Sequence, residues 1–146
     1  MKIGVLTDMS GTYSDLAGPG SLIAVQMAVA DFIAKEKPDF KIEVISADHQ
    51  NKGDIAASKA REWIDTEKVD VIVDLVTTST ALAVMEVAKE KNRITLVSGA
   101  ASTPITNEQC TDINVHWTYD TYALAAGTGK AVVKQRSEER RVGKEC

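Results

Sequence analysis

Hydroxyl-bearing side chains follow three of the apolar stretches in the chain. They are Ser10, Thr12, Tyr13 and Ser14 in the first segment, Thr77, Thr78, Ser79 and Thr80 in the second, and Ser98, Ser102 and Thr103 in the third. Each apolar stretch is interpreted as a β-strand that leads into a helix, so all three segments are expected at the carboxyl edge of one parallel sheet. Ligands bind at this edge in open α/β sheets, and hydroxyls beside free helix N-terminal amides suit a small carboxylate.

Three of these residues carry more specific expectations. Ser79 and Thr80 stand where a helix is predicted to begin, so the helix dipole adds to the preference for an anion. Tyr13 is an aromatic residue in a glycine-containing loop with no apolar stripe to join, which is compatible with a ligand-covering role or with simple exposure. The alternative for every Ser and Thr is a helix cap or a turn. Convergence of three such segments on one edge favours a binding site.

Composition and charge narrow the class of protein. The 146 residues are 44% hydrophobic and 26% charged, as is ordinary for a globular domain, and the net charge of -4 argues against a nucleic-acid surface. No apolar run approaches the ~20 residues that a membrane crossing needs, so no direct membrane insertion is expected. The first strand begins at once, without the pattern of a secretory signal. This fits a cytoplasmic protein, or a mature or truncated form of an exported one.

Strand and helix patterns alternate along the chain. Strands are predicted over residues 2–6, 41–47, 69–75 and 94–97, with a short apolar piece at 114–117, and helices over 20–35, 54–66, from about 80 to 91, and 119–134. Short crossovers of this kind require a parallel sheet flanked by helices on both faces, in three α/β/α layers. The second strand, which alternates apolar and polar residues, is expected at an edge.

Several side chains have expected roles within these elements. The apolar stripe of the first helix is predicted to be buried, and it consists of Leu22, Val25, Val29, Phe32 and Ile33. Trp63 is expected in the core. Asp54 is a candidate N-cap and Asn92 a candidate C-cap.

The last residues, 136–146 (RSEERRVGKEC), are charged and lack apolar periodicity. They resemble the in-frame translation of a common DNA sequencing adapter, the alternative being a natural solvated tail. We therefore assign residues 1–135 to the domain and set 136–146 apart as a non-native tail. Without the tail Cys110 is the remaining cysteine, so no intrachain disulfide is expected.

Motifs of common enzymes are incomplete in this sequence. Gly18-Pro19-Gly20 is followed by Ile23 where a dinucleotide fingerprint needs its third glycine, and the stretch at 127–130 (GTGK) lacks the spacing of a phosphate loop. His49, His116 and Cys110 have no second ligand at metal spacing and are interpreted as turn, strand-end and loop residues. Neither a metal nor a cofactor is expected.

The order of the motifs resembles the type I substrate-binding proteins of ABC importers, of the leucine/isoleucine/valine-binding kind. The segments that carry the resemblance are residues 3–11 (IGVLTDMSG), 18–20 (GPG), 42–50 (IEVISADHQ), 69–73 (VDVIV), 79–80 (ST) and 98–102 (SGAAS). The resemblance implies two α/β lobes joined by a hinge, with the ligand held between them. This chain would be most of the first lobe, with the second lobe absent.

The resemblance also implies which residues bind the ligand and where the protein acts. Ser79, Thr80 and the turn formed by Ala100, Ala101, Ser102 and Thr103 would hold the carboxylate end, with Tyr13 lying over it. The ligand would be an amino acid or an aromatic acid, the partner an ABC permease, and the location the periplasm. The protein would be a non-catalytic receptor.

Two other functions remain open at this stage. An α/β enzyme of flavodoxin-like or nucleotide-using type would share the same sheet-edge loops, because many enzymes use them. A ligand-sensing regulatory domain would use the same fold without a permease.

Overall fold

The fold is a five-stranded parallel sheet with helices, and the computed structural model describes residues 1–136. The strands are β1 (Lys2–Thr7), β2 (Glu43–Asp48), β3 (Val71–Asp74), β4 (Ile94–Val97) and β5 (Asn114–His116). The helices are α1 (Gly18–Glu36), α2 (Gly53–Glu62), α3 (Thr78–Lys91) and α4 (Thr121–Arg136), with short helical turns at Trp63–Glu67 and Thr103–Ile105. The strand order is β2-β1-β3-β4-β5, and every pairing is parallel. The predicted fold class is confirmed, and β2 is an edge strand as expected.

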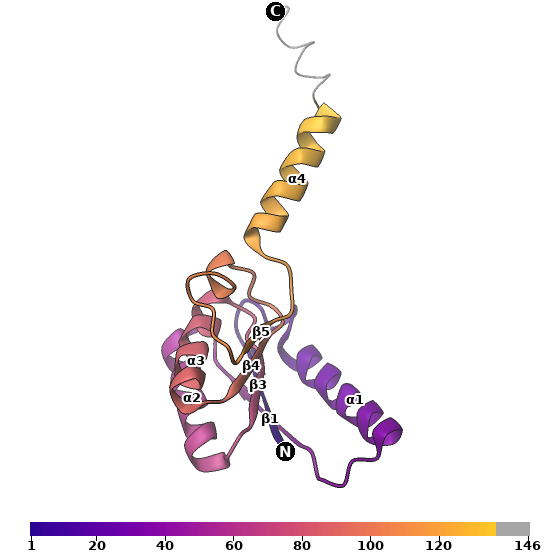
Figure 1. The fold of residues 1–146 in the computed structure, drawn as a ribbon, viewed down its shortest axis with the longest axis vertical. Coiled ribbons are helices and arrows are strands. Elements are labelled where there is room, and N and C mark those ends of the chain that lie inside the picture. Colours follow the sequence, from indigo (N-terminus) through magenta and orange to yellow (C-terminus); the bar gives the residue numbers. More distant parts are fainter. Residues whose placement is uncertain (137–146) are drawn as a thin grey trace, which may run out of the picture.

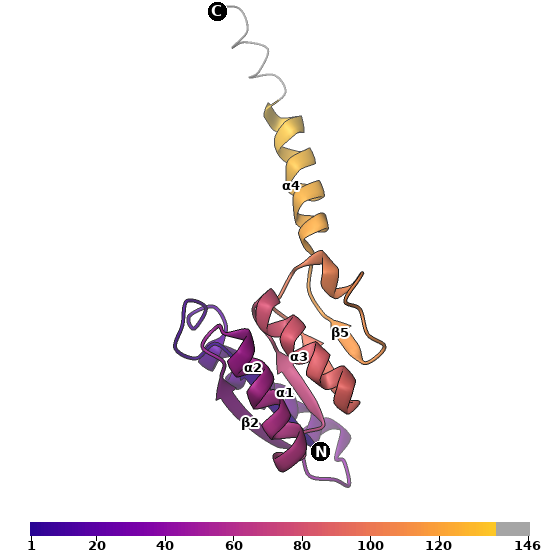
Figure 2. The same ribbon diagram turned by 90° about the vertical axis from the view of Figure 1, so that its left-hand side faces the viewer.

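The helices divide between the two faces of the sheet (Figure 1). Helices α2 and α3 cover one face, while α1 is the one helix that residues 1–136 place on the other. Helix α4 extends away from the sheet in both views (Figure 1 and Figure 2). Almost all of its residues from 121 to 135 are exposed. The non-native tail predicted at 136–146 lies, from residue 137 onward, outside the described residues.

The hydrophobic core lies between the sheet and the α2–α3 layer. Its strand members point to one face because side chains alternate along a strand, and they include Leu6, Ile72 and Val97. Trp63 is 4% exposed and belongs to this core, as predicted. Its ring lies directly over Gly4, where an added Cβ would come within 2.5 Å of the indole.

Helix α1 corrects the prediction made for its apolar stripe. Leu22, Val25 and Val29 are only partly buried, and Phe32 and Ile33 are 44% and 43% exposed. Gly18 is the one buried residue of the helix. The sequence stripe has the right period, but an apolar cavity of about 750 Å³ lies between this helix and the sheet. Periodicity indicates which side of a helix is apolar; it does not show whether other elements fill the space beneath it.

The helix ends give one further correction and one confirmation. The N-cap of α2 is Lys52, without a side-chain cap, and Asp54 lies inside the first turn, where its charge favours the positive end of the dipole. Asn92 ends α3 in the left-handed conformation at φ 52°, as a C-cap does.

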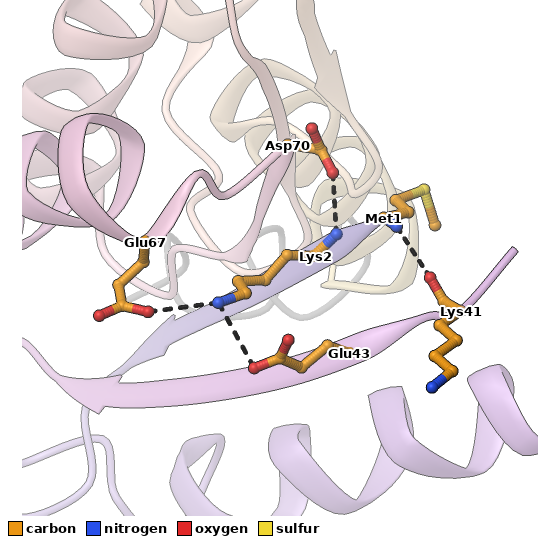
Figure 3. Close-up of polar contacts among 6 residues, drawn as sticks. All are labelled: Met1, Lys2, Lys41, Glu43, Glu67 and Asp70. Atoms are coloured by element: carbon orange, nitrogen blue, oxygen red, sulfur yellow. Dashed lines mark hydrogen bonds and ion pairs between the residues drawn. The ribbon is translucent and has the colours of Figure 1, made fainter.

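A cluster of polar contacts at the start of β1 joins this strand to neighbouring segments of the chain (Figure 3). The backbone N–H of Lys2 donates to Asp70 at 2.8 Å, and its ammonium lies 3.2 Å from Glu67 and 3.4 Å from Glu43. The Glu67 hydrogen bond raises the pKa of Lys2 above 10.5, against a smaller opposing effect of burial. Because this pKa is raised, the ammonium of Lys2 adds to the free energy of unfolding below pH 10.5. This contribution is lost as the pH rises through the raised pKa.

Gly4→Ala is expected to lower the free energy of unfolding by about 1–3 kcal/mol, because its methyl group overlaps the buried Trp63 ring. Urea denaturation measures this as a shift in midpoint at unchanged slope. Gly20→Ala is the control, since an added Cβ there has no neighbour within 4 Å. Equal stability of the two variants would contradict the packing of Trp63 on β1.

Candidate functional site

The strands end in register at one edge of the sheet. Thr7 pairs with Asp48, Leu6 with Asp74, and Val97 with both Asp74 and His116. The segments that follow β1, β3 and β4 therefore leave the sheet side by side, in the spatial order of those strands. The three hydroxyl-bearing segments therefore lie at one edge of the sheet, as predicted from the sequence.

Two carboxylates organise the loop after β1. Asp8 accepts hydrogen bonds from the backbone N–H of Gly11 at 2.8 Å and of Tyr13 at 2.9 Å. Asp48, at the end of β2, accepts from Met9 N–H at 3.0 Å and from the Ser10 hydroxyl at 2.5 Å. These carboxylates are therefore occupied by the protein's own donors, and they hold the loop in one shape.

The pKa of Asp48 reflects these contacts. Partial burial raises the pKa, but hydrogen bonds from Ser10, Gln50 and Met9 together lower it below the ordinary value of 3.8. A carboxyl group whose pKa is lowered by folding stabilises the fold at any pH above its pKa in the unfolded chain. This stabilisation is lost as the pH falls through the pKa of the folded state. The loop should therefore keep its shape at neutral pH and loosen in acid.

Tyr13 lies on this loop, with its side chain 37% exposed. Its backbone N–H is held by Asp8, and its carbonyl oxygen accepts from Leu16 and Ala17 at 3.1 Å and 3.0 Å. The backbone of Tyr13 is therefore well anchored while its ring keeps access to solvent.

Helix α3 begins at the same edge without a side-chain cap. Its N-cap is Thr77, whose hydroxyl donates to Asn51 at 2.8 Å instead of capping the helix. Ser79 is exposed in the first turn, whereas Thr80 is buried and its hydroxyl donates to the Thr77 carbonyl at 2.9 Å. The exposed hydroxyl of Ser79 thus lies beside helix amides that no side chain of the described region caps, a suitable place for an anion.

The turn after β4 is held from several sides. Ala100 is buried, its N–H donates to Leu75, and its carbonyl oxygen lies 2.7 Å from His116 Nε2. Ala101 accepts from Thr121 N–H at 2.7 Å, and the hydroxyls of Thr103 and Thr121 are 2.6 Å apart. The turn is thereby tied to the first residue of α4. Ser102 is half-buried within it.

Tyr13, Ser79 and Ser102 thus follow adjacent strands, but no hydrogen bond among residues 1–136 joins them directly. Their role in ligand binding stays a prediction. His116 ends β5 and Cys110 is exposed, as expected for strand-end and loop residues.

The burial of His49 and Asp74, at the same edge, was not predicted from the sequence. His49 is fully buried; its Nδ1 accepts from Asn51 N–H at 3.0 Å, and its Nε2 has no hydrogen-bond partner among residues 1–136. Burial lowers the pKa of His49 below 6.5, against the opposing charges of Asp8, Asp48 and Asp74. Asp74 ends β3 with φ 84° and is followed by Leu75 at φ 57°, both left-handed conformations. The positions of His49 and Asp74 at strand ends were the sequence signal that could have placed them at this edge. Whether they are buried depends on the neighbouring loops.

Residues 1–136 contain no group of three or more His, Cys, Asp or Glu side chains able to hold a metal ion. Over the same residues, none of the helices has the length and apolar character needed to cross a bilayer.

Comparison with known proteins gives consistent matches. The profile of a family described as periplasmic binding protein matches residues 1–143. A periplasmic binding protein structure from Burkholderia mallei is 55% identical, with a TM-score of 0.86 over 92% of this chain and 36% of its own. A branched chain amino acid ABC transporter periplasmic ligand-binding protein from Burkholderia xenovorans is 36% identical, with a TM-score of 0.84 and the same coverage, 92% and 36%.

A third structure, a solute binding protein of an ABC transporter from R. palustris in complex with 4-hydroxybenzoate, is 25% identical. Its TM-score is 0.74, over 93% of this chain and 36% of its own. The search among curated proteins found no match. The chain therefore spans 36% of the length of these three structures.

Ser10→Ala is expected to raise the pKa of Asp48, because it removes the hydroxyl that donates to the ionised carboxylate. An NMR titration of the Asp48 carboxyl carbon measures the change. Thr12→Ala, on the same loop but without a bond to Asp48, is the matched control. An unchanged Asp48 titration in Ser10→Ala would contradict the described anchoring of the loop.

Proposed function

Because the chain belongs to the periplasmic binding protein family, we propose that it is part of the first lobe of a solute receptor serving an ABC importer. The receptor acts in the periplasm without catalysis. It captures a small carboxylate between two lobes and presents it to a permease. Closure of the lobes about a hinge would signal that the site is occupied.

The observation that carries this proposal is the uncapped N-terminus of α3 beside the exposed hydroxyl of Ser79. Backbone N–H groups and the positive end of the helix dipole favour an anion there. The neighbouring carboxylates, Asp8 and Asp48, are already engaged by backbone amides and by Ser10, so the loop around them is preformed. In the proposed site, the Ser79 hydroxyl, the backbone amide of Thr80 and the turn 100–103 surround the carboxylate, and Tyr13 covers the ligand; the Thr80 side chain itself is buried.

The ligand class is a branched-chain amino acid or an aromatic acid. Both classes carry the carboxylate that this edge favours, and the names of the relatives include a branched-chain amino acid transporter and a complex with 4-hydroxybenzoate. The two classes differ at the far end of the molecule, which would contact the second lobe. Contacts outside this chain would therefore choose between them.

The full-length protein is expected to melt at a higher temperature in the presence of its ligand, because a ligand that binds only the folded state stabilises it. Thermal denaturation with leucine, isoleucine and valine, and separately with benzoate and 4-hydroxybenzoate, measures the shift. Amines of matching size without a carboxylate are the control compounds. Absence of a shift with every acid would contradict the proposed receptor function.

Ser79→Ala in the full-length protein is expected to weaken binding of the acid by about 1–3 kcal/mol, as for loss of a hydrogen bond to a charged group. Isothermal titration calorimetry measures the affinity. Ser58→Ala, an exposed serine on α2, is the matched control and should bind normally. Equal affinity of the two variants would remove Ser79 from the site.

A further inference from the structure

The turn between β2 and α2 meets the first turn of α3. Thr77, the N-cap residue of α3, donates its hydroxyl to Asn51 Oδ1 at 2.8 Å, although the two residues are 26 positions apart in sequence. Gly53, the first residue of α2, lies against the same helix turn, since a Cβ added there would come within 3.2 Å of the Ser79 carbonyl oxygen. The starts of the two helices are therefore held together by a side-chain hydrogen bond and by close backbone packing.

The backbone of Asn51 has a fixed position. Its N–H donates to Nδ1 of His49 at 3.0 Å, and the His49 ring is fully buried. Gln50 and Asn51 have φ angles of 51° and 54°, in the left-handed region that Asn adopts more readily than most residues. The N–H of Lys52 closes the turn by donating to the His49 carbonyl oxygen at 2.9 Å. A turn anchored by a buried ring thus presents the Asn51 side chain to Thr77.

Thr77 has the residue type and the backbone of a helix cap but lacks the capping contact. The hydroxyl oxygen of an N-cap Thr usually accepts from the N–H of the second or third helical residue, here Ser79 or Thr80. The backbone angles of Thr77, φ -118° and ψ 150°, suit this role, yet among residues 1–136 its side chain makes no such bond. Its proton goes to Asn51, and its oxygen lies 3.0 Å from the Thr80 hydroxyl. The contact with Asn51 therefore replaces the cap.

We propose that Asn51 is a positioning residue of the ligand site: it holds the Thr77 hydroxyl away from the first amides of α3 and so leaves those amides to the carboxylate of the ligand. This inference rests on the proposed function, because it concerns how the anion site at α3 is kept open. A hydroxyl oxygen and a carboxylate compete for the same unpaired N–H groups. Asn51 does not touch the ligand and acts through Thr77.

A purely structural role is the alternative for the bond between Asn51 and Thr77. In that role the bond only ties the turn between β2 and α2 to α3. Removing the Asn51 side chain would then loosen the turn, and a further loss of the Thr77 hydroxyl would repair nothing. In the positioning role the Thr77 hydroxyl becomes harmful once Asn51 releases it, so deleting that hydroxyl restores the site. The two roles therefore differ in the double variant.

Two variants of the full-length protein separate these roles. Asn51→Gly removes the side-chain acceptor without strain, because glycine adopts a φ of 54° readily. Asn51→Gly combined with Thr77→Val also removes the hydroxyl, and valine keeps the branched shape of threonine and suits the extended backbone at this position. Gln50→Gly is the matched control, since Gln50 is exposed on the same turn and has a φ of 51°.

Isothermal titration calorimetry with leucine and with 4-hydroxybenzoate measures the affinity of each variant. Asn51→Gly is expected to bind the acid about 5-fold more weakly than the wild type, which is the size of one N-cap contact. Gln50→Gly and the double variant are expected to bind like the wild type. Unchanged affinity in Asn51→Gly, or weak binding that persists in the double variant, would overturn the proposal.

Amide hydrogen exchange without any acid tests the action of Asn51 on Thr77 separately. In Asn51→Gly the N–H of Ser79 or of Thr80 is expected to exchange about 5-fold more slowly, because the released hydroxyl accepts from it. The double variant is expected to exchange at the wild-type rate. A wild-type protein that binds neither acid would count against the proposed function, whereas unchanged exchange at both amides in Asn51→Gly would overturn the role of Asn51.

Discussion

The structure depends on a sheet whose central strands are apolar on both faces. Side chains alternate along a strand, so Ile72 and Val73 point to opposite sides and each side needs its own cover. On one side α2 and α3 provide it, with Trp63 packed so closely that the opposing strand residue must be Gly4. On the other side α1 leaves the cavity open. The same constraint explains why one side of the sheet is closely packed and why the cavity on the other side is lined by apolar residues.

The parallel arrangement of the strands also produces the candidate site. Because all five strands run in one direction, their following loops meet at one edge, where helices begin and amides are unpaired. Asp8 and Asp48 are engaged by the protein's own donors in this arrangement. They accept hydrogen bonds from backbone N–H groups and Ser10, and so hold the loop that carries Tyr13.

Much of the fold could be predicted from the sequence because its signals are local. Alternation of strand and helix patterns predicted the parallel sheet, and alternation of apolar and polar residues predicted the edge position of β2. The core position of Trp63 and the C-cap at Asn92 were also predicted. The prediction that the apolar stripe of α1 is buried was wrong, although the period of the stripe is helical. Burial depends on elements that need not be neighbours in sequence. The cap assigned to Asp54 was wrong by two residues, within the usual uncertainty of helix ends.

The sequence by itself determined the order of elements, the edge at which the hydroxyl segments gather, and the resemblance to solute receptors, because these follow from local periodicity and motif order. Only the tertiary structure decided that His49 and Asp74 are buried, each with one polar atom that has no hydrogen-bond partner in the described residues 1–136. It also decided that Thr80 is turned inward while Ser79 is exposed. These features arise where segments distant in the chain come together. Burial and hydrogen-bond pairing are properties of that three-dimensional contact, and no single segment carries them.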